Sequence, residues 1–246
     1  VENISPLAND DELLDSDYAS VRASLEYDLT DNIEVFLSGY RYKDDSISWV
    51  QRIVSEYPDS GFYPGLNLPY TNISASDPRK IRSDFDHEAS EDAEGVSLDV
   101  NWNLGALTLN SLSAYNDSER AIAQDLDGTD VAARNQWSVL GSKTFTQEFQ
   151  LLSEDDTALR WILGLFHFEE QSDYFLRITI PVLPGSEFTS TPVEVETTSQ
   201  AIFGQIDYTL TDKLELTAGL RYSRDEKDML RGLFFTLDGI NPIIND

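Results

Sequence analysis

The chain has 246 residues, of which 45 are acidic and 17 are basic, so its formal net charge at pH 7 is −28. This strongly negative charge argues against binding to a nucleic-acid backbone, because such binding requires clustered lysine and arginine. It also argues against docking on an anionic lipid surface. The lack of cysteine excludes disulfides and cysteine-ligated metal centres. Hydrophobic residues make up 40% of the chain, which argues against intrinsic disorder.

No segment approaches the roughly 18–20 consecutive apolar residues of a membrane helix. The longest apolar run, Trp161 to Phe168, has eight residues and includes a histidine. The first residues, Val1 to Ile4, precede an acidic stretch rather than the basic and apolar segments of a secretory signal. We therefore expect a mature form or a piece of something longer.

Apolar and polar residues alternate with a period of two along most of the chain, which is typical of β-strands with one apolar and one polar face. The first strand is expected over Ala19 to Leu29, where the odd positions are apolar and the even positions are polar. A second strand is expected from Ile33 to Tyr40, after a short turn at Leu29 to Asn32. Together the two segments predict a β-hairpin.

The hairpin pattern recurs three more times along the chain. Its strands are expected at Val96 to Trp102 and Ala106 to Tyr115, at Lys143 to Leu152 and Leu159 to Gln171, and at Gln200 to Leu210 and Leu214 to Arg224. Two segments, Leu159 to Phe168 and part of Ala106 to Tyr115, are apolar on both faces. The sequence leaves open whether these two are buried on both sides or face a packed interior.

The predicted connections differ between the two ends of the strands. Within each hairpin the turn has about three to five residues, near the usual hairpin length. Between hairpins the connections are long, at Asp44 to Asp92, Asn116 to Gly141 and Ser172 to Ser199. Short turns at one end and long loops at the other are typical of outer-membrane β-barrels.

Strand length favours the same interpretation. Ten residues rise about 33 Å, and a tilt of ~40° leaves about 25 Å along a barrel axis, the height of the apolar band of bacterial outer-membrane barrels. Strands in soluble sandwiches are typically ~5–6 residues long. We predict an all-β fold: an antiparallel, up-and-down transmembrane β-barrel segment with about eight long strands, short periplasmic turns and long extracellular loops.

Two stretches resemble a known family. One is Phe145-Thr146-Gln147-Glu148-Phe149-Gln150-Leu151 followed by Leu159 to Phe166, and the other runs from Ala201 to Gln205, through Tyr208 to Leu214, and into Leu216 to Tyr222. Both are similar to segments of TonB-dependent outer-membrane receptors. The resemblance extends over Ala19 to Lys227 and is strongest from Lys143 onward.

The resemblance implies a barrel of about 22 strands whose lumen is plugged by an N-terminal domain. It also implies a place in the bacterial cell outer membrane, contact with outer-membrane lipid, and TonB-coupled uptake of a scarce nutrient. A ferric siderophore is the leading ligand, with cobalamin and glycans as others, and energy arrives from the TonB–ExbB–ExbD complex through the plug. Because the sequence shows no plug, TonB-contact box or terminal aromatic strand, residues 1–246 are expected to be a partial barrel domain without the plug domain and C-terminal strands.

No catalytic residue, cofactor or enzyme activity is expected. The carboxylate pairs Asp155-Asp156 and Glu169-Glu170 suit solvated loops and a polar lumen, and a Gly-x-Ser-x-Gly nucleophile elbow is absent. Asp125 to Asp130 is similar to a calcium loop but lacks the full ligand spacing and the closing glutamate of an EF-hand. His87 lies in the acidic segment Asp84 to Glu88. Solvated acidic loops are favoured for both, so no metal site is predicted.

The first long loop carries the candidate ligand-binding residues. Its aromatic side chains are Trp49, Tyr57, Phe62, Tyr63 and Tyr70. Exposed aromatics on a long loop are candidate ligand contacts. The alternative is that they pack the loop on itself, as in an Ω-loop.

Strand alternation also predicts which side chains face the lumen. They are Arg22, Glu26, Asp99, Asn101, Glu148, Gln150, Glu215 and Arg221. Leu98 and Leu216 are expected to face lipid. Two alternatives stay open: a soluble or surface-attached β-rich protein that binds or hydrolyses carbohydrate, and a passive porin-like barrel or adhesin that shares the fold but lacks a plug.

Overall fold

The computed structural model describes residues 1–7, 9, 13–47, 50–51, 77–129, 131–154, 157–181, 187–190, 193–230, 233–236 and 243–244. The long strands are β2 (Tyr18–Thr30), β3 (Ile33–Asp44), β5 (Glu88–Asn103), β6 (Leu107–Asp125), β7 (Asn135–Ser153), β8 (Leu159–Thr179), β10 (Val193–Thr211) and β11 (Leu214–Leu230). The short strands are β1 (Glu2–Asn3), β4 (Lys80–Ile81), β9 (Glu187–Ser190), β12 (Leu233–Thr236) and β13 (Ile243–Ile244). The prediction of an all-β chain with eight long strands is confirmed. Among the described residues, no helix is long and apolar enough to cross a membrane.

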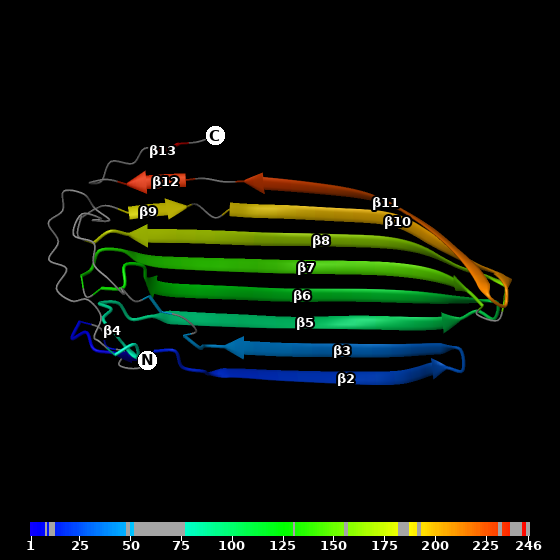
Figure 1. Cartoon of the computed structure of the whole chain (residues 1–246), viewed down its shortest axis with the longest axis horizontal. Coiled ribbons are helices and arrows are strands. Elements are labelled where there is room, and N and C mark those ends of the chain that lie inside the picture. The colour runs from blue at the N-terminus through cyan, green and yellow to red at the C-terminus, as the bar shows by residue number, and fades with distance from the viewer. Residues whose placement is uncertain are drawn as a thin grey trace.

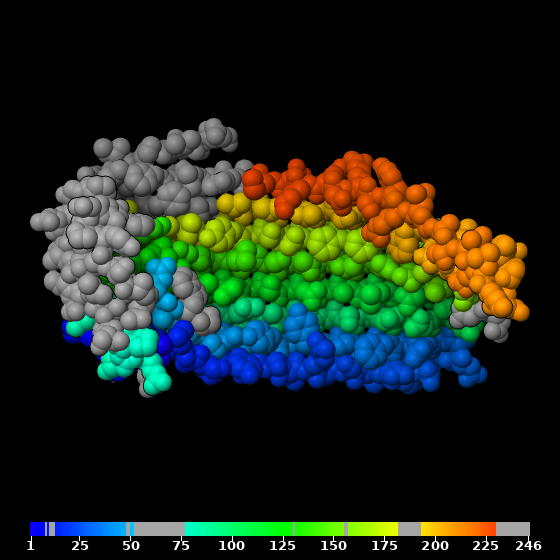
Figure 2. All heavy atoms as spheres, viewed as in Figure 1, coloured from blue at the N-terminus to red at the C-terminus, as the bar shows by residue number. Residues whose placement is uncertain are grey.

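The long strands form one sheet in which every neighbouring pair is antiparallel. Their order across the sheet is β2, β3, β5, β6, β7, β8, β10 and β11. Because this is also their order in the chain, the sheet is the up-and-down meander that the sequence predicted. Figures 1 and 2 show these strands side by side, from blue β2 at one edge to orange β11 at the other. The short strand β9 pairs with β8 and β12, and β12 also pairs with β13.

The two ends of the sheet differ as predicted. The described residues of the hairpin turns, at 31–32, 104–106, 154, 157–158 and 212–213, gather at one end, here called the turn end (Figure 1). The strand ends that flank the connections between hairpins lie at the opposite end, here called the long-connection end, together with the described residues of 45–87, 126–134 and 180–192.

The strands extend further than the alternating pattern indicated. From β5 onward the long strands have 16 to 21 residues, whereas about ten were expected. The connection between β6 and β7 is therefore only 126–134 rather than Asn116 to Gly141. Beyond the apolar band both faces of a strand meet polar surroundings, so the alternation fades while the backbone hydrogen bonds continue.

The register assigns the side chains to two faces. Residues that are paired across antiparallel strands share a face. One such row crosses the sheet through Glu26, Phe36, Asp99, Leu112, Glu148, Phe166, Ala201 and Ser223. Counting in steps of two from this row puts all the predicted lumen-facing residues on its face, here called the mixed face. Leu98 and Leu216 both fall on the other face, here called the apolar face, as predicted.

The apolar face crosses the sheet from one edge to the other. Its large exposed side chains include Leu25, Leu37, Leu98, Tyr115, Phe149, Leu165, Ile202 and Leu220. Their exposed fractions run from 38% at Leu98 to 82% at Leu220. A continuous exposed apolar surface of this kind marks a membrane or protein contact rather than a surface in water.

The structure also settles the facing of the segment from Leu159 to Phe168. Leu163 and Leu165 lie on the apolar face, with exposed fractions of 47% and 53%. Phe166 lies on the mixed face, where the Arg221 guanidinium carbon is 5.3 Å from the centre of its ring. The segment is therefore exposed on one side and covered by polar side chains on the other, rather than buried on both.

Two glycines allow aromatic rings to lie flat on the mixed face. Tyr40 is paired with Gly95, and Phe203 is paired with Gly164. A Cβ atom at either glycine would collide with the ring opposite it. The rings thus occupy the space that a side chain would fill, in the manner of aromatic rescue of strand glycines.

Buried apolar side chains gather mainly at the long-connection end. Leu13 and Ile81 are each 2% exposed, and Ala123 and Ala133 are 7% and 6% exposed. The N-terminal segment is held there because β1 pairs in parallel with β4. This small packed unit positions the polar groups described next.

Candidate functional site

The predicted ligand-binding aromatics Trp49, Tyr57, Phe62, Tyr63 and Tyr70 all lie outside the described residues. Their role therefore stays a prediction. No site was predicted for the two carboxylate pairs. Asp155 and Asp156 also lie outside the described residues, and Glu169 and Glu170 are successive residues of β8 that point to opposite faces.

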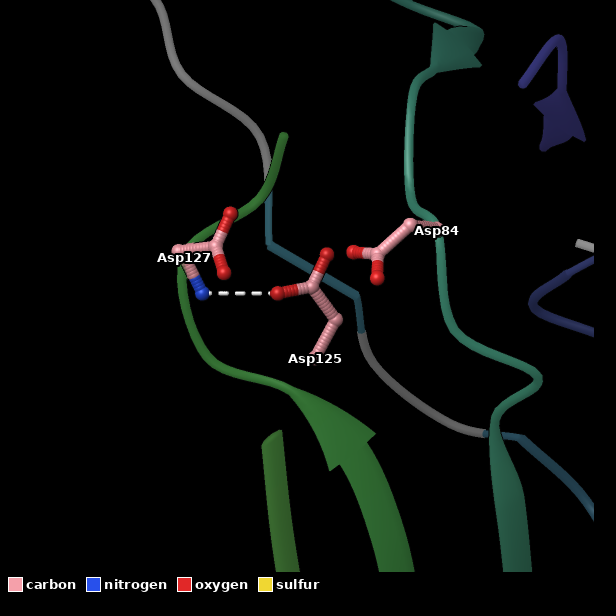
Figure 3. Close-up of side chains that lie close together, drawn as sticks. All are labelled: Asp84, Asp125 and Asp127. Atoms are coloured by element: carbon pink, nitrogen blue, oxygen red, sulfur yellow. Dashed lines mark hydrogen bonds between the residues drawn. The ribbon is translucent and has the colours of Figure 1, made fainter. Parts of the chain in front are cut away.

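Three aspartates from two separate segments converge at the long-connection end. Asp84 precedes β5, Asp125 ends β6, and Asp127 lies in the connection to β7. One carboxylate oxygen from each lies within 4.8 Å of the other two. Figure 3 shows the three carboxylates facing one another. We call this group the acidic cluster.

Local turns fix two of the three carboxylates. Asp125 Oδ1 accepts hydrogen bonds from the backbone N–H of Asp127 at 2.7 Å and of Gly128 at 3.1 Å. The carboxylate of Asp127 accepts the backbone N–H of Thr129 at 3.0 Å and of Arg134 at 2.8 Å. Gly128 has a φ of +67°, a conformation that suits glycine. The order Asp-x-Asp-Gly-Thr thus favours side-chain-to-backbone turns that hold both acids in place.

Asp84 is brought to this loop by a second set of contacts. Its backbone N–H donates to the carbonyl of Thr129 at 3.3 Å. The preceding residue, Ser83, exchanges two hydrogen bonds with the side chain of Asn3, both at 3.1 Å. The N-terminal segment, the segment before β5 and the β6–β7 connection therefore pack as one unit.

Asp125 of the cluster and Asn135, its partner across the two strands, each bury an oxygen that accepts no hydrogen bond in the described structure. Asp125 is 1% exposed, and the oxygen is its Oδ2. Asn135 is directly opposite Asp125 across β6 and β7, is 6% exposed, and the oxygen is its Oδ1. A buried acceptor without a donor is costly, because it has lost its hydrogen bonds to water.

The electrostatics of the cluster are unfavourable for three charged carboxylates. Burial, together with the negative charge of Asp127, raises the pKa of Asp125 to about 7. Burial also raises the pKa of Asp127. Like charges held close together in a partly dry site disfavour the ionised form of both Asp125 and Asp127.

His87 and Asp125 correct the sequence analysis, which favoured solvated loop residues at both positions. His87 is 3% exposed, and its Nδ1 lies 3.2 Å from the carbonyl oxygen of Phe85. The ring of Phe85 meets Trp137 edge to face at 5.2 Å, and Arg177 lies over Trp137 at 5.5 Å. The segment before β5 thus packs against Trp137 of β7, and a local pattern of acidic residues does not reveal such a long-range contact.

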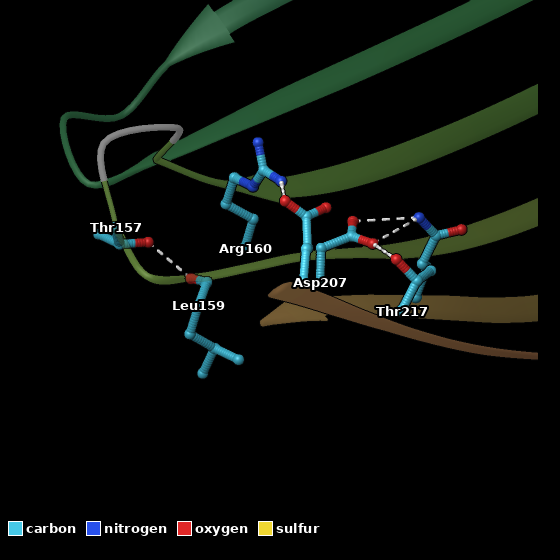
Figure 4. Close-up of polar contacts among 7 residues, drawn as sticks. Thr157, Leu159, Arg160, Asp207 and Thr217 are labelled. Atoms are coloured by element: carbon cyan, nitrogen blue, oxygen red, sulfur yellow. Dashed lines mark hydrogen bonds and ion pairs between the residues drawn. The ribbon is translucent and has the colours of Figure 1, made fainter. Parts of the chain in front are cut away.

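The mixed face carries a second polar group near the turn end (Figure 4). Arg160 Nη2 is 2.9 Å from Glu215 Oε2. Thr217 Oγ1 donates to Asp207 at 2.6 Å, and Gln205 Nε2 donates to the same carboxylate at 3.1 and 3.2 Å. Polar side chains that satisfy one another across strands suit a face that meets water or another polar surface.

A long-stranded meander with one apolar face and one mixed face has the organisation of an outer-membrane β-barrel. Residues 39–239 match the family described as TonB dependent receptor-like, beta-barrel. The chain therefore belongs to the TonB-dependent receptor β-barrel family. Members of this family are transporters of the bacterial outer membrane rather than enzymes.

Comparison with solved structures gives the same fold. The chain is similar to the ferric yersiniabactin uptake receptor FyuA from Yersinia pestis, with a TM-score of 0.70 and 14% identity over 98% of this chain and 34% of that one. A second match, to the ferric preacinetobactin receptor BauA from Acinetobacter baumannii, has a TM-score of 0.45 and 10% identity over 94% of this chain and 39% of that one. The chain thus spans about a third of the length of FyuA.

Membership of this family orients the sheet. In outer-membrane barrels the apolar face meets lipid, the short turns are periplasmic and the longer loops are extracellular. The acidic cluster is accordingly extracellular, and the mixed face lines the lumen. The alternative of a soluble carbohydrate-binding sandwich does not hold, because the long strands form one sheet rather than two facing layers.

Proposed function

We propose that this chain forms part of a receptor that takes up a ferric siderophore with energy delivered through TonB. Membership of the TonB-dependent receptor family is the observation that carries the proposal. The iron chelate as ligand is supported by the likeness to FyuA, which is described as an uptake receptor for ferric yersiniabactin.

The proposed partners follow from the two faces of the sheet. Outer-membrane lipid contacts the apolar face, and a plug domain fills the lumen and connects the receptor to the TonB–ExbB–ExbD complex. We also propose that residues 1–246 are a central part of the barrel domain. Within the described residues β2 and β11 pair on one side each, and an unpaired strand edge in hydrocarbon is costly, so further strands must close the barrel.

Uptake measurements test this function directly. Bacteria with and without the gene would be supplied with the iron-55 complexes of yersiniabactin and of a panel of other siderophores. We expect uptake of at least one chelate to require both this protein and an intact TonB. Uptake that persists without TonB would instead indicate a passive porin-like barrel, and transport of a glycan or cobalamin in place of every chelate would overturn the ligand class.

The aromatic side chains on the first long loop are proposed to contact the ligand. Replacing Tyr63 and Tyr70 together by alanine should weaken binding roughly tenfold or more, because aromatic anchors often contribute more than about 1 kcal/mol each. The matched control replaces both by phenylalanine, which keeps the rings. Unchanged affinity in the alanine variant would show that these residues only pack the loop on itself.

A further inference from the structure

The geometry of the acidic cluster fits one shared cation. One oxygen each of Asp84, Asp125 and Asp127 lies within 4.8 Å of the other two. Calcium binds oxygen at about 2.3–2.6 Å, so two ligands on opposite sides of the ion are about 5 Å apart. An ion placed between the three carboxylates can therefore reach all of them without a rearrangement of the backbone.

A buried carboxylate oxygen of Asp125 points into the cluster and also favours a bound cation. Asp125 is 1% exposed, and its Oδ1 is occupied by two backbone N–H groups. Its Oδ2 is buried without a hydrogen-bond donor, and Figure 3 shows this oxygen facing Asp84. The fold thus buries a carboxylate oxygen that accepts no well-formed hydrogen bond in the described structure, which is a condition that a bound cation relieves.

The donor set selects the kind of cation. All three donors are carboxylate oxygens, which suit Ca²⁺ and Mg²⁺, whereas Zn²⁺ and Cu²⁺ favour nitrogen or sulfur ligands. Asn135 places a further buried oxygen without a donor opposite Asp125. Calcium tolerates irregular sets of six to eight oxygens, whereas Mg²⁺ demands a near-ideal octahedron and retains several waters. Ligands drawn from two loops therefore favour calcium.

We propose that Asp84, Asp125 and Asp127 form a Ca²⁺ site on the extracellular side of the barrel. The ion neutralises the mutual repulsion of the three carboxylates and fastens the β6–β7 connection to the segment before β5. A Cβ atom at Gly128 would lie 3.3 Å from the backbone of Gln51, so the site also borders the start of the first long loop. The inference is independent of which nutrient the receptor carries.

Hydrogen exchange measured by mass spectrometry tests the site in the receptor purified in detergent. Calcium chloride should slow amide exchange in 82–87 and 126–134, with half the effect at about 0.1–1 mM, the range of extracellular calcium modules. Asp125→Asn and Asp84→Asn should each raise that midpoint about tenfold or abolish the response. Asp212→Asn, in a turn at the opposite end of the sheet, is the matched control and should behave as the unaltered receptor.

The outcomes are distinguishable even if one variant folds poorly. The carboxylate of Asp84 makes none of the hydrogen bonds that shape the turn at 125–129, so Asp84→Asn tests the cation with that turn intact. Sodium chloride at matched ionic strength should not slow exchange, and magnesium chloride should act only at higher concentration. The proposal is overturned if sodium or magnesium reproduces the calcium effect, or if both variants respond as the unaltered receptor does.

Discussion

The middle of the long strands exposes apolar side chains, whereas the long-connection end buries polar side chains beside apolar ones. In the sheet, Leu25 and Leu220 on the apolar face are 60% and 82% exposed. At the long-connection end the polar residues Asn3, Ser83 and Asp125 are 4%, 1% and 1% exposed. The two regions differ because the middle of the strands faces hydrocarbon, where apolar side chains are stable when exposed, whereas the long-connection end lies in water.

The two regions are also held together differently. The strands are joined by continuous backbone ladders, such as that of β6 and β7 from Leu107–Ser153 to Asp125–Asn135. In hydrocarbon no water can replace these hydrogen bonds, so the ladder alone stabilises the sheet strongly. The long-connection end instead depends on particular side chains, such as Asn3 on Ser83, whose loss leaves buried backbone groups without partners.

The largest expected effect is a charge placed on the apolar face. Leu98→Arg should destabilise the barrel by about 2–4 kcal/mol if the site lies near the membrane midplane. Ser97→Arg, on the mixed face, is the control and should be tolerated. The measurement is the free energy of unfolding in lipid vesicles. Leu216 on the apolar face and Thr217 on the mixed face offer a second pair. The assigned faces would be wrong if Leu216→Lys and Thr217→Lys proved equally harmless.

A side chain at Gly164 should have the next largest effect. Gly164→Val would collide with Phe203 and should destabilise the barrel by about 1–3 kcal/mol, as overpacking generally does. Phe203→Ala in the same chain should recover most of that loss. A double-mutant cycle of unfolding free energies measures the coupling, and additive losses would contradict the packing of this ring against the glycine.

Loss of the Asn3 side chain should act on the long-connection end alone. Asn3→Ala removes both hydrogen bonds to Ser83 and should reduce local stability by about 1–2 kcal/mol. Hydrogen exchange should accelerate in 1–7 and 80–87 while the strands stay protected. Asn32→Ala, at an exposed turn, is the control, and equal acceleration along the strands would show that the two regions are not separate.

The smallest expected effect is at the ion pair of Arg160 and Glu215. Both side chains are partly exposed, at 38% and 47%, and exposed pairs contribute about 0–1 kcal/mol. Arg160→Met should therefore change the unfolding free energy by less than about 1 kcal/mol. A larger loss of unfolding free energy would indicate that water reaches the mixed face less freely at this ion pair than the exposed fractions of the two side chains suggest.

Most of the sheet could be predicted from the sequence, whereas the packed end could not. The alternation of Leu98 with Asp99 is local, and such alternation correctly placed the predicted lumen-facing residues of β2, β5, β7 and β11 on one face of the sheet. The ends of the strands were predicted too short, because alternation fades where both faces leave the apolar band. His87 was expected in solvent, because its segment is buried through contacts with distant strands, such as that of Phe85 with Trp137.

The sequence by itself determined the eight strands, their hairpins and the polarity of the faces of the strands that alternate cleanly, because a period of two is carried by neighbouring residues. It left the facing of Leu159 to Phe168 open. It also showed that Asp125 to Asp130 is similar to a calcium loop, a likeness that neighbouring residues alone carry. Only the tertiary structure decided that Asp84 joins Asp125 and Asp127, since that meeting depends on pairing between strands far apart in the chain. A cation site built from two loops becomes visible only when the fold brings its parts together.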